Sequence, residues 1–509
     1  MSETTQKIDR EISPTTSTSQ ALDARNKLVI GLLLVSAFVV ILNETLMAVA
    51  IPHLMRDLSI TASAAQWLST AFMLTMAVVI PITGYLLQRF NTRPVFITAM
   101  SLFSTGTLIA ATAPGFEILL GGRIVQATGT AIMMPLLMTT VMTLVPPASR
   151  GRTMGNISIV ISVAPAIGPT ISGAILSVLD WRWMFLLILP IAIAALTLGA
   201  SRMRNVTTPR RTHFDVPSVI VSAFGFGGVV YGLSNLGAAA SGGNPLTGWI
   251  PLGVGAVALT IFVWRQLRLQ RRDAALLDLR TFTSRTFTFS ISMLTLSMMV
   301  LFGVIILLPF YMQNVMGLDV LSTGLLLLPG GLTMGLLAPT VGRIYDRIGP
   351  TALLTTGSIL VSIVLWFLTT LTENTSFWWV LAAHMTLSVG LALLFTPLFS
   401  AGLGSLRPQL YSHGSAIVGT VQQLAGASGT ALFITVMEAQ TATLIAGGAS
   451  KLAATASGIR LAFLVGAIIS LAAIPVAFLV RSPKEAVQAE ASSPSPEPEP
   501  DAEGALAAS

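Results

Sequence analysis

The sequence predicts an all-α protein that crosses a membrane fourteen times. Hydrophobic residues make up 53% of the 509 residues and charged residues only 10%, whereas about a quarter of the residues of an ordinary soluble protein are charged. Apolar stretches long enough to cross a ~30 Å hydrocarbon core as helices recur along the chain. Lys and Arg residues between these stretches gather in alternate loops.

Each apolar stretch is about 18 to 26 residues long, near the ~20 residues that a membrane-spanning helix needs. The predicted spans are residues 28–51, 65–87, 94–112, 117–141, 154–178, 183–200, 214–236, 249–266, 286–311, 322–341, 351–371, 378–402, 412–437 and 460–480.

The Lys and Arg residues test this topology. With an even number of spans both chain ends lie on one side, and that side holds 23 of the 28 Lys and Arg residues. The other side holds Arg56, Arg182, Lys451 and Arg460, and Arg123 lies inside a span. Because loops rich in Lys and Arg stay in the cytoplasm, we expect a protein of the cell (inner) membrane with both ends cytoplasmic. The same bias explains the net charge of +7, so we expect no nucleic-acid partner.

The two chain ends differ in composition from the spans. Residues 1–27 are polar and contain no apolar run, so we expect no cleavable signal peptide. Residues 482–509 are rich in Glu, Pro, Ser and Ala, a composition that buries too little apolar surface to fold. We expect both segments to be disordered cytoplasmic tails.

Several kinds of chemistry are excluded by residue type. The chain has no cysteine, which excludes disulfides, thiolate metal sites and cysteine nucleophiles. It has no Gly-x-x-x-x-Gly-Lys-Ser/Thr phosphate loop and no His-Glu-x-x-His sequence. We therefore expect no metal, no cofactor, no catalytic residues and no enzymatic activity.

Ionisable side chains inside a bilayer cost at least ~2.5 kcal/mol and are kept mainly where they have a use. Three stand well inside the predicted spans: Glu44, Arg123 and His384. A rise of 1.5 Å per residue puts Glu44 roughly 10 Å and the other two roughly 9 Å from the outer membrane surface. We expect them to meet in the outer half of one cavity, with Asn43 and Gln126 able to hydrogen-bond to the same site.

Alternatives remain for each of these residues. Glu44 and Arg123 can couple transport to protons, because burial and a nearby arginine act oppositely on carboxyl protonation, or they can form a structural ion pair. For His384, a hydrogen bond to a neighbouring helix is favoured over a proton relay. Asn43 and Gln126 can serve the site or only join helices.

Two short segments after predicted spans share one pattern. The first runs from Gly84 to Arg93 and contains Gln88 and Arg89. The second, eight spans later, has Gly342, Asp346 and Arg347 at the corresponding positions. An Asp at a helix end can hold the cytoplasmic side shut, and the first copy has Gln88 in its place.

Three further segments with distinctive residues lie inside predicted spans. Leu42–Asn43–Glu44–Thr45 lies in the first span, Leu120–Gly129 with Arg123 and Gln126 in the fourth, and the fifth carries Gly155, Gly168, Pro169 and Gly173. In this order, the segments resemble the motifs of the major facilitator superfamily, in its fourteen-helix drug:proton antiporter branch, and most closely its lincomycin-resistance-like exporters. In that branch an acid normally stands at the position of Asn43, whereas here the acid is Glu44.

The resemblance implies the major facilitator fold. Two six-helix halves would occupy residues 28–200 and 286–481, and residues 201–285 would form two inserted helices with cytoplasmic loops. The segment of the fifth span resembles the family's antiporter motif.

The resemblance also implies proton-coupled export of small hydrophobic or cationic compounds, such as drugs or antibiotics, by alternating access. Glu44 and Arg123 would couple the protons, and Asn43, Gln126 and His384 would line the substrate cavity. The expected partners are a small-molecule substrate, protons and the lipid bilayer, and we expect a monomer.

Other functions stay open. The same machinery could export a specific metabolite such as an amino acid or a diamine, and uptake by symport is less favoured. A membrane sensor or scaffold without flux is the alternative from another class. A channel is disfavoured because no ring of charged residues is visible.

Overall fold

The computed structural model describes residues 24–206, 209, 214–240 and 244–480. Of the two segments predicted to be disordered, residues 1–23 and 482–509 lie outside the described residues, whereas residues 24–27 form the start of a helix. Fourteen helical segments of the described chain are long and apolar enough to cross a membrane, which confirms the predicted fold class and number of spans. The helices are α1 (Ala24–Asp57), α2 (Ala62–Arg89), α3 (Thr92–Ala111), α4 (Phe116–Leu144), α5 (Arg150–Leu176), α6 (Arg182–Arg202), α7 (Val216–Ala240), α8 (Leu246–Leu269), α9 (Arg285–Asn314), α10 (Val320–Ile348), α11 (Thr351–Leu368), α12 (Phe377–Gly404), α13 (Tyr411–Ala446), α14 (Lys451–Leu471) and the short α15 (Ala473–Ala477).

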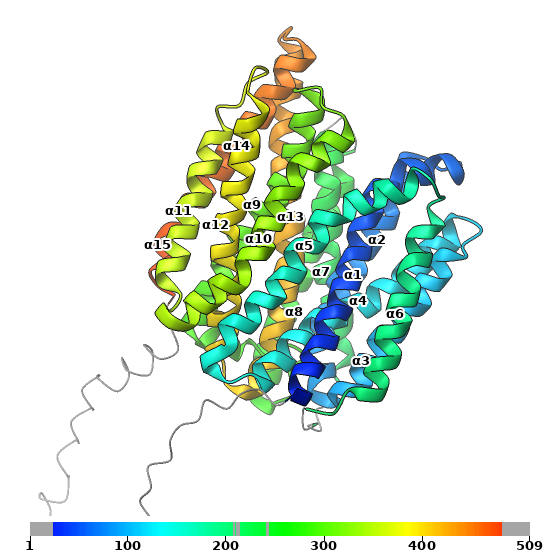
Figure 1. Cartoon of the computed structure of the whole chain (residues 1–509), viewed down its shortest axis with the longest axis vertical. Helices are drawn as coiled ribbons and strands as arrows, with labels where there is room; N and C mark the ends of the chain where they lie inside the picture. Colours follow the sequence, from blue (N-terminus) through cyan, green and yellow to red (C-terminus); the bar gives the residue numbers. More distant parts are fainter. Residues whose placement is uncertain (1–23, 207–208, 210–213, 241–243, 481–509) are drawn as a thin grey trace, which may run out of the picture.

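The hairpin of α13 and α14 is longer than the sequence predicted. Its helices end at Ala446 and begin at Lys451, whereas the predicted spans end at residue 437 and begin at residue 460, so most of the predicted loop is helical. The segment between the predicted spans is rich in Ala, Thr and Ser, which lowers its hydropathy without preventing a helix. Gly448, with a φ of +86°, makes the turn. Figure 1 shows the orange tip of this hairpin extending beyond the other helices.

The helices form two bundles joined along one seam. Helices α1 to α6 contact one another, as do α9 to α15, and we call these sets the first and second bundles; α5 and α10 pack most closely on each other, across the seam. Figure 1 shows α1, α3 and α6 on one side of the molecule and α11, α12 and α14 on the other. The main contacts between the bundles pair α5 with α10 and α2 with α13, while α7 packs on α8, α2 and α13.

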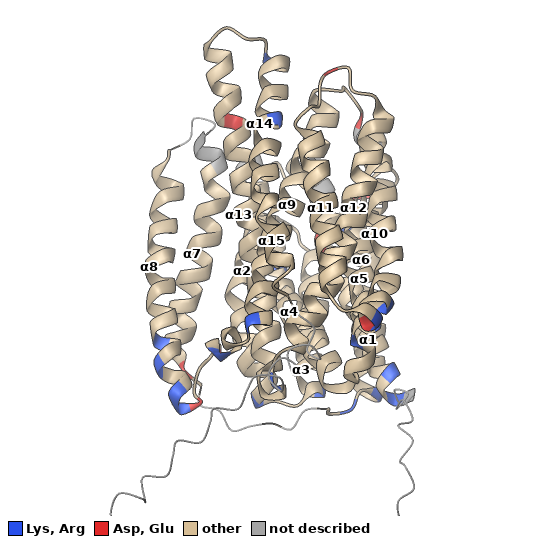
Figure 2. Ribbon diagram, turned by 90° about the vertical axis from the view of Figure 1, so that its left-hand side faces the viewer, with Lys and Arg blue, Asp and Glu red and all other residues tan. Residues whose placement is uncertain are grey.

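Lys and Arg residues gather at one end of the molecule (Figure 2). We call this the basic end, and it includes Arg89, Arg150, Arg202, Arg268 and Arg347, each at or beside a helix terminus. In a protein that spans a bilayer, such one-sided Lys and Arg residues are typical of the cytoplasmic side.

Close packing of α3 on α4 makes a stability prediction. A Cβ at Gly129 would overlap the carbonyl oxygen of Ala99, whereas nothing lies within 4 Å of a Cβ at Gly121 on the same helix. We expect Gly129→Leu to lower the free energy of unfolding by about 1–3 kcal/mol through overpacking, and Gly121→Leu to change it little. Thermal unfolding of both purified variants checks this, and equal melting temperatures would contradict it.

An ion pair joins α7 to α8 at the basic end. Arg265 donates from Nε and Nη2 to the two carboxylate oxygens of Asp215, at 2.8 and 2.7 Å. Beside it, Gln266 Nε2 donates to Ser218 Oγ at 2.8 Å. The hydrogen bond from Arg265 is the main reason why the pKa of Asp215, just before α7, lies below its usual 3.8.

This ion pair gives a pH-dependent prediction. Because the folded-state pKa of Asp215 is lowered, the pair stabilises the fold above about pH 3.8, and this is lost as the pH falls through the folded-state pKa. The Arg265 side chain is 34% exposed, so Asp215→Asn should cost only about 0.5–1 kcal/mol at neutral pH. Melting temperatures of variant and native protein should converge in acid; a difference that stays constant would contradict this.

Candidate functional site

A buried polar cluster surrounds Arg123, in the part of α4 farther from the basic end. The Arg123 side chain is 1% exposed, and its Nη1 donates to Asn43 Oδ1 of α1 at 3.3 Å and to Gln126 Oε1 at 2.7 Å. Gln126 Nε2 donates to Thr107 Oγ1 of α3 at 2.8 Å. We call Asn43, Thr107, Arg123 and Gln126 the Arg123 cluster. Its hydrogen bonds tie three helices of the first bundle around one positive charge.

Neutral groups stabilise the charge of Arg123. The guanidinium Cζ lies 4.1 Å from the centroid of the Phe72 ring of α2, a cation–π contact that stabilises a cation away from water. Its Nε has no hydrogen-bond partner among the described residues, and none of the ion pairs formed by these residues includes Arg123. The cation is therefore fixed in position but has no bound carboxylate.

Glu44 is a carboxylate that interacts electrostatically with this charge. It follows Asn43 on α1 and is partly exposed, and Arg123 acts on it electrostatically. In the described part of the chain the two side chains form no ion pair, so the structural ion pair considered above is not what the geometry shows. A carboxylate beside a fixed cation, yet not bound to it, can gain and lose a proton.

Helix α5 packs on α1 directly after Glu44. A Cβ at Gly168 would overlap Thr45 Oγ1, and Ser172 Oγ donates to the carbonyl oxygen of Leu46 at 2.9 Å. Pro169 and Gly173 follow in the same stretch of α5, and nothing lies within 4 Å of a Cβ at Gly173. The small residues of α5 thus allow its close approach to the segment that carries Glu44.

The same helix contacts α10 at the basic end. Asp346 accepts two hydrogen bonds from the first turn of α5, from Gly151 N to Oδ1 at 2.8 Å and from Arg152 N to Oδ2 at 2.9 Å. Gly155 packs against the backbone of α10, and Gly342 against that of α5, so closely that a Cβ at either would overlap it. A carboxylate at a helix N-terminus is favoured by the unpaired N–H groups and the helix dipole. Asp346 therefore forms a hydrogen-bonded contact between the two bundles.

The first copy of the motif makes a weaker contact of the same kind. Gln88 Nε2, at the end of α2, donates to the carbonyl oxygen of Gln409 at 3.2 Å, just before α13. A Cβ at Gly84 would lie 3.0 Å from His413 Nδ1 of α13. The neutral amide of Gln88 thus bonds once to a carbonyl, where Asp346 bonds twice to amides.

The arginines of the two motifs lie at the surface of the basic end. Arg93 donates from Nη2 to the carbonyl oxygen of Ala200 at 2.6 Å, and its backbone N–H donates to Asn205 Oδ1 at 3.2 Å. Arg89 is half-buried and Arg347 is exposed. Arg93 therefore ties α3 to the end of α6, within the first bundle.

Contacts between the bundles lie on the side of the basic end. Along α5 and α10 they run from Gly151 to Ala166, whereas nothing lies within 4 Å of a Cβ at Gly173 or Gly324, nearer the other end. Along α2 and α13 they reach Gln423, whose Nε2 lies 3.6 Å from the sulfur of Met76. The structure is thus closed between the bundles at the basic end.

His384 lies apart from the Arg123 cluster. It belongs to α12 of the second bundle, where its Nε2 is 3.2 Å from the carbonyl oxygen of Leu327 of α10. A Cβ at Gly330 would overlap its ring. The structure therefore brings together Asn43, Arg123 and Gln126 but shows His384 in a contact between α10 and α12.

The sequence did not identify Thr107 of the Arg123 cluster or Phe72, whose ring contacts the guanidinium. Thr107 is one of several hydroxyl residues in its span, and only its level in the membrane could have singled it out. Phe72 is one of 23 phenylalanines, and no sequence signal distinguishes it.

Comparison with known proteins places the chain among transporters. The family model for the Major Facilitator Superfamily matches residues 33–430. The chain is 42% identical over 456 residues to the uncharacterized MFS-type transporter YcnB of Bacillus subtilis, covering 90% of this chain and 95% of that protein. It is 40% identical over 462 residues to the lincomycin resistance protein LmrB of Listeria monocytogenes, covering 90% and 97%. The crystal structure of the human organic anion transporter MFSD10 (TETRAN) matches with a TM-score of 0.63 at 15% identity, covering 89% of this chain and 99% of that one.

Proposed function

The chain belongs to the Major Facilitator Superfamily and is a transporter, not an enzyme, and we propose that it is a proton-coupled exporter of small hydrophobic or cationic compounds. In this proposal Glu44 exchanges the proton and Arg123 modulates it. Asn43 and Gln126 hold the guanidinium in place. No cofactor takes part, because the proton gradient supplies the energy.

One observation carries this proposal. Glu44 is partly exposed beside a fully buried cation with which it forms no ion pair in the described chain. A fixed positive charge favours the ionised carboxylate, and burial favours the neutral one. A change in the exposure of Glu44 can therefore move a proton on or off.

Helix α5 offers a mechanical link between this site and the closure at the basic end. It contacts α1 at Thr45 and Leu46, beside Glu44, and α10 at Asp346. A shift of α1 on protonation would displace α5 and so weaken or strengthen the contact with α10. Such rocking of one bundle against the other is the usual form of alternating access.

The substrate class is proposed from the site and the relatives. The Glu44 carboxylate can bind either a proton or a cationic substrate. Several relatives are named lincomycin resistance proteins. We propose that the basic end is cytoplasmic, on the positive-inside rule, that the protein acts as a monomer in the cell (inner) membrane, and that drugs or antibiotics leave from the far end. His384 is retained as a proposed cavity residue of the second bundle.

Transport by the purified full chain tests this function. The chain is reconstituted into liposomes, and uptake of lincomycin, a lipophilic cation and a diamine is followed with and without an imposed pH gradient. We expect accumulation of lincomycin or the lipophilic cation only when the interior is acidic, since export then corresponds to uptake by inverted molecules. Accumulation of the diamine alone would favour a specific metabolite exporter. Transport that ignores the pH gradient would reject proton coupling, and absence of any flux would favour the sensor or scaffold.

A further inference from the structure

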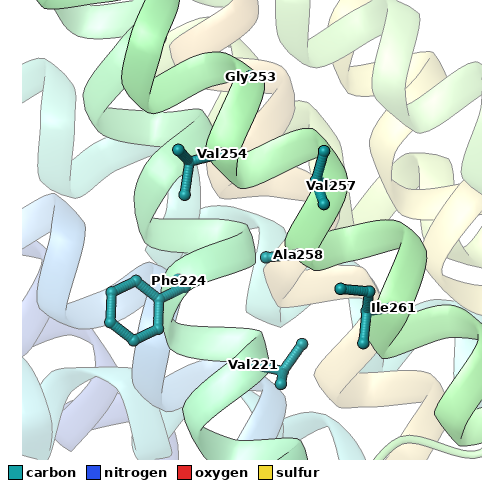
Figure 3. A pocket seen from close by; sticks show the side chains of 7 residues that line it. All are labelled: Val221, Phe224, Gly253, Val254, Val257, Ala258 and Ile261. Atoms are coloured by element: carbon teal, nitrogen blue, oxygen red, sulfur yellow. The ribbon is translucent and has the colours of Figure 1, made fainter.

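A groove of about 500 Å³ lies on the surface of the hairpin formed by α7 and α8. Figure 3 shows its lining side chains, two from α7 and the others from α8. The lining is apolar throughout and includes Val221, Phe224, Gly253, Val254, Val257 and Ile261. Gly253 is exposed and adds no side chain to the groove, and Ala258 is buried.

The groove faces outward from the protein. Phe224 is 63% exposed, Val257 62% and Val254 51%. Within the described chain, α8 packs mainly on α7 and on the short 3₁₀ helix η2 (Gln270–Arg272) that follows it. In a protein that spans a bilayer, an exposed apolar face at this depth meets lipid.

A cluster of arginines stands below the groove, at the basic end of α8. Arg268 stacks on Trp264, with its Cζ 3.8 Å from a ring centroid, and Arg271 and Arg272 follow in η2. None of the ion pairs among the described residues includes these three. Arg265, by contrast, is bound to Asp215, and Asp273 is bound to Arg280. The three arginines therefore remain available to an anion.

Groove and arginines are aligned along one face of α8. Arg268 follows Ile261 by seven residues, which is two helical turns and roughly 10 Å on the same face. From Ile261 up to Gly253 the groove covers roughly 12 Å of helix, close to the roughly 15 Å thickness of one leaflet of the hydrocarbon core. Trp264 lies between them, and tryptophan is the residue favoured at the membrane interface.

We propose that this hairpin binds an anionic phospholipid, with one acyl chain in the groove and the phosphate at Arg268, Arg271 and Arg272. The apolar lining matches the chain, and the free guanidinium groups match the phosphate in charge and in hydrogen-bonding geometry. The site is independent of the proposed transport function.

Binding of defined lipids to the full chain in detergent tests the proposal. Phosphatidylglycerol and phosphatidylcholine with identical acyl chains are titrated, and bound lipid is counted by native mass spectrometry. We expect tighter binding of phosphatidylglycerol, and a fall of roughly fivefold in its affinity for each arginine removed in Arg268→Gln/Arg271→Gln. The matched control is Arg202→Gln/Arg204→Gln at the end of α6, which should bind as the native chain does.

A second pair of variants tests the groove alone. Nothing lies within 4 Å of a Cβ at Gly253, so Gly253→Leu fills the groove without an internal clash, and its melting temperature should equal that of the native chain. We expect it to lose phosphatidylglycerol binding while all arginines remain. Gly31→Leu on α1, equally uncrowded, should bind normally.

Several results would overturn the proposal. Unchanged phosphatidylglycerol affinity in Arg268→Gln/Arg271→Gln or in Gly253→Leu would do so, as would equal affinity for the two lipids. A native dimer that Gly253→Leu converts to monomers would show that a second copy of the chain, and not lipid, covers the groove.

Discussion

A Glu44→Gln variant is expected to lose accumulation of substrate against a gradient while it still moves substrate downhill. Glutamine keeps the shape and polarity of the side chain but cannot exchange a proton. Because Glu44 forms no ion pair with Arg123 in the described chain, its replacement should leave the Arg123 cluster and the fold intact. Accumulation in liposomes with an acidic interior measures the loss, which should be complete within the sensitivity of the assay. Downhill flux is followed in parallel without a pH gradient.

Glu117→Gln is the matched control. Glu117 is an exposed carboxylate in the first turn of α4, near the same end of the bundle as Glu44. Its replacement removes one charge without touching the Arg123 cluster, so accumulation should stay at the native level. Native accumulation by Glu44→Gln would mean that the proton is carried elsewhere, and His384 would be the next side chain to replace.

The position of the acid can be tested with one further variant. Asn43 Oδ1 already accepts a hydrogen bond from Arg123 at 3.3 Å, so Asn43→Asp in the Glu44→Gln background puts a carboxylate in direct contact with the guanidinium. A buried pair of this kind is held by its mutual attraction. We expect the double variant to regain coupling only in part, because a carboxylate that is bound to the Arg123 guanidinium takes up a proton less readily. Full recovery would show that either position serves.

The fold was predictable because membrane helices carry a strong signal. A long apolar run is unmistakable, and the one-sided Lys and Arg residues fix the number of spans. The predicted spans were too short at residues 438–446 and 451–459, where Ala, Thr and Ser continue the helices without high hydropathy. Helix length beyond the apolar run is decided by local capping, as at Ser450, whose side chain accepts from Ala453 N at 3.3 Å, and this leaves little trace in hydropathy.

The candidate site was predictable in depth but not in contacts. Counting residues from the span ends put Glu44 and Arg123 at one level, and the structure joins Arg123 to Asn43, the neighbour of Glu44. Rotation about the helix axis decides which of two adjacent residues meets a partner, and a chain position alone does not give it. The same holds for His384, whose depth was similar but whose ring contacts α10. Phe72 acts through its place in the packing, for which the sequence has no signal.

Asp346→Asn is expected to release the closure at the basic end. The Asp346 carboxylate accepts from two N–H groups of α5 at 2.8 and 2.9 Å. Asparagine keeps one carbonyl oxygen, but its NH2 group faces an N–H donor where the second bond was, and it carries no charge for the helix dipole. A hydrogen bond to a charged group contributes about 1.5–3 kcal/mol, so losing it should favour the state open at the basic end about ten- to a hundredfold.

Labelling of single cysteines measures this shift. The chain has no cysteine, so Gly173→Cys on α5, which has open space around its Cβ, gives a reporter without background. Its reaction with a membrane-impermeant maleimide from the far side should slow in Asp346→Asn, because opening at the basic end closes the other end. Gln88→Ala, which removes the single bond of 3.2 Å to Gln409, should slow it much less. An unchanged rate in Asp346→Asn would mean that glycine packing between α5 and α10, and not this carboxylate, holds the bundles together.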